Sequence, residues 1–218
     1  MTVAVDDILD DVSRTLLDTA RRTWSRVALV GYLNEALRAS SAVKPDIYTL
    51  RANVPLDEGT LQELPAGGVA LIDIPRNSLQ SGGEGRVVTQ VDAEMLAEAN
   101  RFWPRATTQS QVEHYTADPR DPRRFQVFPP NDGNGLVEML YATVPSVTGS
   151  SGEAFPLADF YQPAITAYME AKAHAKNTRR QDLVKAGAAL QRWGTLMGLN
   201  AKALAAIAPK VLVSEGKQ

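Results

Sequence analysis

The 218-residue sequence contains no cysteine and only two histidines, His114 and His174. Without cysteine, a disulfide scaffold, thiol catalysis and any zinc or iron–sulfur site built on thiolates are excluded. His174 lies in an expected helix but has no second histidine four residues away, as a helical two-histidine metal site requires. The net charge of −2 lacks the basic excess that is typical of a dedicated nucleic-acid binder.

Long apolar runs are also missing from the sequence. No stretch approaches the roughly 20 apolar residues that cross a bilayer. The first eleven residues carry four aspartates and neither lysine nor arginine, so we expect no signal peptide and no membrane partner. With 44% hydrophobic and 22% charged residues, the composition is that of a globular protein large enough to build its own core.

Motifs of common active sites are absent as well. The sequence has no G-x-S-x-G nucleophile motif, and its glycine-rich segment 81–85 lacks the lysine of a P-loop. The segment 131–135 (Asn-Asp-Gly-Asn-Gly) lacks the acidic spacing and closing glutamate of an EF-hand, while Asn-Gly and Asp-Gly favour a hairpin turn. We therefore expect no cofactor, no metal site and no catalytic residues.

Apolar periodicity predicts helices at both ends of the chain and strands between them. Helices are expected at 6–22, 25–39, 93–100, 157–176 and 180–199. Strands are expected at 47–54, 69–74 and 111–116, and the clearest β feature is a long hairpin from Phe125 to Val144 that turns at 131–135.

These elements predict an α+β fold with the antiparallel β region inserted into a helical bundle. The bundle is assigned to residues 1–44 and 153–200, the β region to 45–152, and a C-terminal tail to 201–218. We expect one cooperative domain. Charge is unevenly distributed, because residues 151–218 carry nine basic and five acidic side chains and the remainder has a net charge of −6. Such asymmetry suits stacking of subunits or docking on an acidic partner.

Two other functions stay open on residue types alone. A carboxylate-based cell-wall hydrolase would use a pair such as Glu113 and Glu138, whose separation the sequence does not give. A helical DNA-binding protein would use Arg179, Arg180 and Lys185, and its affinity would depend steeply on salt.

An ordered set of short motifs across residues 5–200 carries a family resemblance. The most distinctive is an Asp-Pro repeat at 118–122 followed by Phe-Gln-Val-Phe-Pro-Pro at 125–130. The others are Leu33-Asn34-Glu35-Ala36 before Pro45, 59–65 (GTLQELP), 74–77 (IPRN), 102–104 (FWP), 115–117 (YTA), 137–142 (VEMLYA), Tyr168 and Ala171-Lys172. In this order and spacing, the sequence resembles the head-to-tail adaptor (connector, head-completion or neck) proteins of tailed phages, particularly short-tailed ones.

The resemblance implies a structural protein rather than an enzyme. Such adaptors are made in the host cytoplasm and assemble in the virion neck, between the capsid portal and the tail. They form a ring, typically a dodecamer, below the portal protein. The ring extends the DNA channel, through which the genome passes without sequence-specific binding, and offers a platform for a tail or nozzle protein.

Two segments are candidate contact sites, one implied by the resemblance and the other by the shape of the expected hairpin. A C-terminal segment commonly reaches the portal in this family, and the corresponding residues here are Lys202, Leu204, Ile207, Lys210, Val211 and Leu212. A long hairpin could add to the sheet edge of a neighbouring subunit. Its candidate ring or tail contacts are Phe125, Val127, Phe128, Asn131, Asp132 and Asn134.

Overall fold

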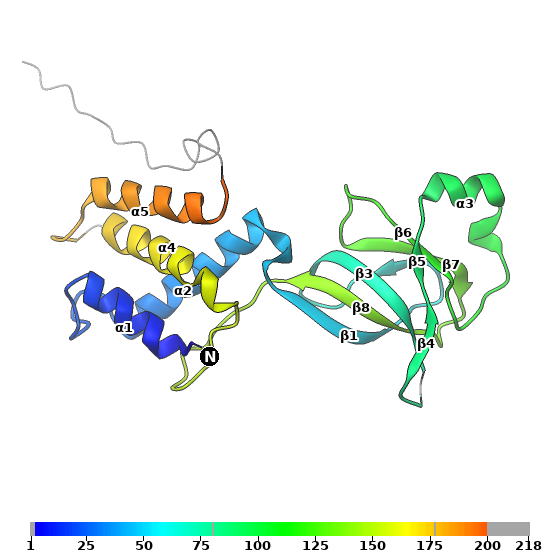
Figure 1. Ribbon diagram of the computed structural model, residues 1–218, viewed down its shortest axis with the longest axis horizontal. Coiled ribbons are helices and arrows are strands. Elements are labelled where there is room, and N and C mark those ends of the chain that lie inside the picture. Colours follow the sequence, from blue (N-terminus) through cyan, green and yellow to red (C-terminus); the bar gives the residue numbers. More distant parts are fainter. Residues whose placement is uncertain (1–2, 80, 177, 200–218) are drawn as a thin grey trace, which may run out of the picture. The chain divides into compact units, whose positions relative to one another are not determined.

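A computed structural model describes residues 3–79, 81–176 and 178–199 (Figure 1). The chain forms two compact units, one from Met1–Lys44 with Pro145–Gln218 and the other from Pro45–Val144. We call them the helical unit and the β unit. Together they contain α-helices and two four-stranded sheets, so the predicted α+β class is confirmed. No described helix is long and apolar enough to cross a membrane.

In the part of the helical unit that the structure describes, there are four α-helices: α1 (Val5–Thr15), α2 (Arg26–Val43), α4 (Gln162–Ala175) and α5 (Leu183–Leu196). Helix α4 contacts each of the other three, which makes it the centre of the unit. Apolar side chains at helical spacing fill the core, among them Ile8, Leu9, Leu29, Leu33, Ile165 and Met169. Two indoles satisfy their N–H groups inside it: Trp24 donates to the Ala173 carbonyl at 3.2 Å, and Trp193 donates to Ser40 Oγ at 3.1 Å.

The first helix is shorter than its apolar spacing predicts. It ends at Thr15 rather than Arg22, and Leu17 and Arg21 have positive φ values of 53° and 52°. The buried Asp18 carboxylate explains the break, because it accepts the backbone N–H groups of Arg22, Thr23 and Trp24 at 2.8–3.1 Å. A short acidic side chain that bonds the following backbone competes with helix propagation.

Acidification is expected to destabilise the helical unit. Backbone donors lower the pKa of four of its carboxylates: Gly152 with Arg26 acts on Asp6, Trp24 on Asp18, Thr148 on Glu153 and Lys185 on Asp182. Because the folded pKa lies below the unfolded value of about 4, the unfolded chain binds more protons as pH falls through this range. The stabilisation is complete above about pH 5 and is lost progressively below it.

Thermal unfolding at pH 7 and pH 3, followed through the far-ultraviolet circular dichroism signal of the helices, measures this effect. We expect a lower Tm at pH 3, and a smaller difference in the variant Asp18→Asn. Equal Tm values at the two pH values would contradict the assignment.

The β unit consists of two sheets. The first has the strand order β1-β8-β3-β4 and is antiparallel throughout, with β1 (Thr49–Pro55), β8 (Leu136–Thr143), β3 (Gly68–Ser78) and β4 (Glu84–Val87). The second has the order β2-β7-β6-β5, with β2 (Gly59–Glu63), β7 (Arg124–Asn131), β6 (His114–Ala117) and β5 (Thr89–Gln90). Strands β5 and β6 pair in parallel, a departure from the all-antiparallel expectation. Helix α3 (Ala93–Ala99) follows its N-cap residue Asp92, whose side chain accepts the Glu94 N–H.

Alternating apolar residues from both sheets form the core of the β unit. The first sheet supplies Val54, Ile74, Val137, Met139 and Tyr141, and the second supplies Tyr115, Phe125 and Val127. The Tyr115 hydroxyl also donates to Asp73 at 2.9 Å, which links β6 to β3. Burial, together with this hydrogen bond, raises the pKa of Tyr115. The two sheets therefore pack as the layers of a sandwich.

The predicted hairpin between Phe125 and Val144 is wrong. Strand β7 pairs with β2 and β6, whereas β8 pairs with β1 and β3, so the segment 131–135 connects two different sheets. The buried Asn131 side chain accepts N–H bonds from Gly133 and Gly135 at 2.9 and 3.1 Å, which directs the turn away from β7. A Cβ on Gly135 would lie 2.1 Å from Asn131 Nδ2, so only glycine allows this close approach.

Candidate interaction surfaces

A row of alternating charges crosses the outer face of the sheet β1-β8-β3-β4. Arg51 on β1 donates to Glu138 Oε1 on β8 at 2.7 Å, and Arg76 Nε on β3 donates to Glu138 Oε2 at 2.9 Å. Arg76 also pairs with Glu84 on β4. In strand order the charges are therefore positive, negative, positive and negative. We call these four residues the charge row.

The charge row accounts for Glu138 without catalysis. Both of its carboxylate oxygens are occupied by arginines, which is the arrangement of a structural ion-pair network. Glu113 directly precedes β6 of the other sheet, where its backbone bonds Thr89 and Phe128 and its side chain is exposed. The structure thus gives the two carboxylates different surroundings and does not build a paired-carboxylate site from them. Among the described residues, no group of three or more His, Asp or Glu is placed to hold a metal ion.

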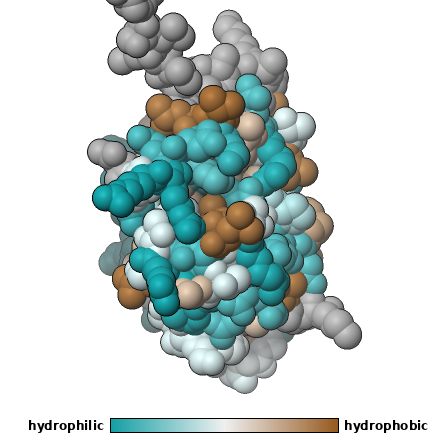
Figure 2. All heavy atoms as spheres, turned by 90° about the vertical axis from the view of Figure 1, so that its left-hand side faces the viewer, coloured by the Kyte–Doolittle hydropathy of each residue, from teal (hydrophilic) through white to brown (hydrophobic). Residues whose placement is uncertain are grey.

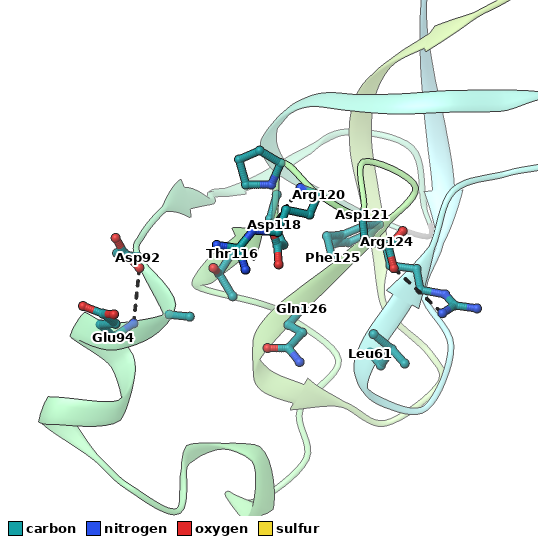
Figure 3. A pocket seen from close by; sticks show the side chains of 13 residues that line it. Leu61, Asp92, Glu94, Thr116, Asp118, Arg120, Asp121, Arg124, Phe125 and Gln126 are labelled. Carbon is teal, nitrogen blue, oxygen red and sulfur yellow. Dashed lines mark hydrogen bonds and ion pairs between the residues drawn. The ribbon is translucent and has the colours of Figure 1, made fainter.

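A charged hollow of about 580 Å³ lies beside β6 and β7 (Figure 3). One side carries Asp92 and Glu94 at the start of α3, and the other carries the turn 118–124 with its Asp-Pro repeat. The turn is held by its own side chains, since Asp118 accepts the Arg120 N–H at 2.9 Å and Arg124 lies 3.8 Å from Asp121. The most distinctive motif of the sequence therefore shapes a surface of mixed charge.

The helical unit carries an apolar hollow of about 350 Å³. Its walls come from α2, α4 and α5: Ala39, Tyr168, Ala171, Lys172, Ala175, Ala186, Leu190 and Trp193. Lys172 closes one side through an ion pair with Glu35 at 2.7 Å, and the hydrogen bond to Glu35 raises the pKa of Lys172. Separate apolar patches interrupt the hydrophilic surface of this unit (Figure 2), and its exposed apolar residues include Leu17, Val27 and Val184.

Several residues of the resemblance motifs have structural roles inside the helical unit. The Asn34 side chain exchanges two hydrogen bonds of 2.9 Å with the backbone of Val147, which fastens the segment after the β unit to α2. Leu33 and Ala36 are fully buried, and Glu35 pairs with Lys172. These contacts explain why the motifs use these residue types.

The candidate contacts of the expected hairpin divide into core and surface. Phe125, Val127 and Asn131 are 0–1% exposed, so their assignment to a ring or tail interface is corrected: they hold the β unit together. Their alternation with polar residues is also typical of a strand with one exposed face. In the folded unit, the side chains of Phe125 and Val127 fill the space between the two sheets, and Asn131 is buried in the turn.

The other three hairpin candidates are at least partly accessible. Phe128 is half-buried, stacked on His114 and edge-on to Trp103. Asp132 and Asn134 are exposed in the turn, where Asp132 accepts the Asn134 N–H at 2.9 Å. Of the predicted ring or tail contacts, these three remain predictions. The portal-docking candidates Lys202, Leu204, Ile207, Lys210, Val211 and Leu212 lie outside the described residues.

Two of the three basic residues considered for DNA binding contact groups of the helical unit. Arg180 lies over the Trp24 ring at 5.8 Å and donates to the Leu17 carbonyl, and Lys185 pairs with Asp182 three residues away. Arg180 and Lys185 thus each have a partner within the helical unit.

The comparison with protein families decides the assignment. The model of the SU10 adaptor protein family matches residues 2–213. The chain belongs to this family. Membership confirms the resemblance to head-to-tail adaptors of tailed phages and places the SU10-type adaptor in the virion between head and tail. The match includes most of the segment 201–218, which the structure does not describe.

Other comparisons add a distant structural likeness. A chain of a structure described as "Neck of empty GTA particle computed with C6 symmetry" is 16% identical to this adaptor, with 70% of this chain and 68% of that chain covered and a TM-score of 0.29. No curated protein matches the chain.

Proposed function

We propose that this adaptor is a non-enzymatic ring component of a short-tailed phage neck. Twelve copies assemble below the portal protein, extend the DNA channel and present a platform for a tail or nozzle protein. The observation that carries the proposal is the family match over residues 2–213, which spans both units and most of the C-terminal segment.

Ring assembly needs two different surfaces on each copy, so that one face meets another face of the next subunit. The β unit offers the charge row and the charged hollow, and the helical unit offers its apolar hollow. A channel wall must let DNA slide without tight binding, which the net charge of −2 favours. The N-terminal aspartates are one candidate lining of the channel. Two of them already have partners, because Asp6 pairs with Arg26 and Asp10 with Arg21, each at 2.5 Å.

Portal docking is proposed for the C-terminal segment. Leu204 and Ile207 lie at helical spacing before Pro209, which stops a helix, and Val211 and Leu212 follow it; these apolar side chains are proposed as the face that enters a groove on the portal. Lys202 and Lys210 flank them and would meet an acidic rim on the portal.

Native mass spectrometry of the purified chain, alone and with the portal of the same phage, tests the proposal. We expect a ring with one adaptor per portal subunit. A chain truncated after Pro209 should keep its circular dichroism spectrum and lose at least tenfold in portal affinity, because part of the apolar face is removed. The matched control is truncation after Val213, which retains that face and the family-matched residues.

Each outcome separates one part of the proposal. If the full-length chain stayed monomeric and did not bind the portal, the proposed adaptor ring would be wrong. Equal portal affinity of the chain truncated after Pro209 would overturn C-terminal docking and leave the ring intact.

A further inference from the structure

The antiparallel sheet β1-β8-β3-β4 has two open edges. Within the described residues, β1 pairs only with β8 and β4 only with β3. Strand β1 pairs with β8 along all seven residues, Thr49–Pro55, without a bulge. It has no lysine, and its proline is the last residue. Bulges, inner prolines and charged side chains, lysine above all, protect edge strands against pairing with another chain. Along Thr49–Val54, β1 has no bulge, no proline and no lysine, and its one charged residue, Arg51, is paired with Glu138 of the same sheet.

The directions of the two edge strands are compatible with joining. Each neighbour in the sheet is antiparallel to the next, so β1 and β4 run in opposite directions. A β4 strand from a second copy, placed beside β1 with its sheet in the same orientation, would therefore continue the antiparallel alternation. The contact uses different surfaces on the two copies, and repetition by rotation produces a ring.

The charge row ends with opposite charges at the two edges. Arg51 at the β1 edge has a side chain that is 57% exposed, and Glu84 at the β4 edge has one that is 78% exposed. Joining β1 to a neighbouring β4 would place Glu84 beside Arg51 and continue the row across the junction. Joining β1 to β1 in the register centred on Arg51 would place arginine against arginine. Opposite charges across strands stabilise pairing and like charges oppose it.

We infer that β1 of one copy pairs with β4 of the next, so that a continuous sheet connects adjacent adaptors. This inference rests on the proposed ring and names its subunit contact. The bulge in β4 sets the register, because Ser78 and Arg76 of β3 face Glu84 and Val87. The same spacing on β1 pairs Arg51 with Glu84 and Thr49 with Val87. The exposed Val87 side chain, 71% accessible in the single chain, becomes covered there.

Disulfide cross-linking tests the contact, and the absence of native cysteine makes every cross-link assignable. The double variant Thr49→Cys with Val87→Cys places thiols on opposite sides of the junction, within the short Cα distance that a disulfide requires. We expect a ladder of covalent oligomers up to ring size on a denaturing gel under mild oxidation. Each single variant should give at most background. The control pair Val27→Cys with Val184→Cys, exposed in the helical unit, should give no ladder.

Hydrogen exchange provides a readout that does not depend on the exact register. Amides of residues 49–55 and 84–87 should exchange at least tenfold more slowly in the assembled ring than in the monomer. Dimers from a single-cysteine variant would indicate a symmetric contact and overturn the inference. A ring in native mass spectrometry with neither ladder nor protection would also overturn it and leave the adaptor function standing. If the unmodified chain forms no ring, the proposed function itself fails.

Discussion

Replacement of Phe125 by alanine is expected to lower the free energy of unfolding of the β unit by about 3–5 kcal/mol. The side chain projects from β7 into the space between the two sheets and is 1% exposed. Truncation removes an aromatic ring from close-packed surroundings and leaves a cavity that a two-layer sandwich cannot close without moving a sheet. Urea unfolding followed by near-ultraviolet circular dichroism measures the loss.

The matched control for Phe125 is Asp132→Ala, in the exposed turn of the same connection. Its stability should stay within about 0.5 kcal/mol of the parent, since no buried group changes. If Phe125→Ala unfolded at the parental urea concentration yet failed to assemble, Phe125 would be an interface residue and its placement in the core would be wrong.

The second large effect is expected at Trp193 in the helical unit. Trp193 is 3% exposed, packs edge-on against Tyr168 with ring centroids 5.2 Å apart, and donates to Ser40. Trp193→Ala should cost about 3–5 kcal/mol, a large share of the 5–15 kcal/mol that holds most folded proteins together. We therefore expect a substantially lower Tm in helical circular dichroism, with the apolar hollow losing one wall.

Two further variants separate the causes of the Trp193 effect. Trp193→Phe keeps most of the ring and removes the hydrogen bond to Ser40, so its cost should be smaller, about 1–2 kcal/mol. Val184→Ala, on the exposed face of the same helix, should change stability by no more than about 0.5 kcal/mol. A Trp193→Ala chain as stable as the Val184→Ala chain would contradict a core role for the indole.

The predicted helices and strands were mostly confirmed because periodicity is a local property. Segments such as α2, α4, α5, β1 and β3 repeat their apolar residues at the spacing of the element that they form. Helix α1 is the instructive exception. Its apolar spacing continues to Ala20, but Asp18 bonds three backbone N–H groups and ends the helix early.

Which strands pair with one another could not be predicted from local periodicity. A turn such as 131–135 with two flanking strands fits a hairpin and a connection between two sheets equally well, because alternation is identical in both. The position of Asn131, whose amide also donates to the carbonyls of Gln109 and Ser110, decides for the second arrangement. Those partners are more than 20 residues away, beyond any local pattern.

The charge row was missed for the same reason. Arg51, Arg76, Glu84 and Glu138 are scattered over the sequence and carry no spacing signal. They become neighbours only because β8 lies between β1 and β3, and this strand order depends on pairing between distant parts of the chain.

The sequence alone therefore determined the α+β class, the types of most elements, the lack of thiol chemistry and the adaptor family, which the family match confirms. These depend on composition, local periodicity and motif order. Only the tertiary structure decided which strands pair, which aromatic residues are core and which charges become neighbours. Burial and cross-strand contact arise when distant segments pack together. The free energy of that packing depends on residues that are far apart in the sequence, so no local pattern reveals it.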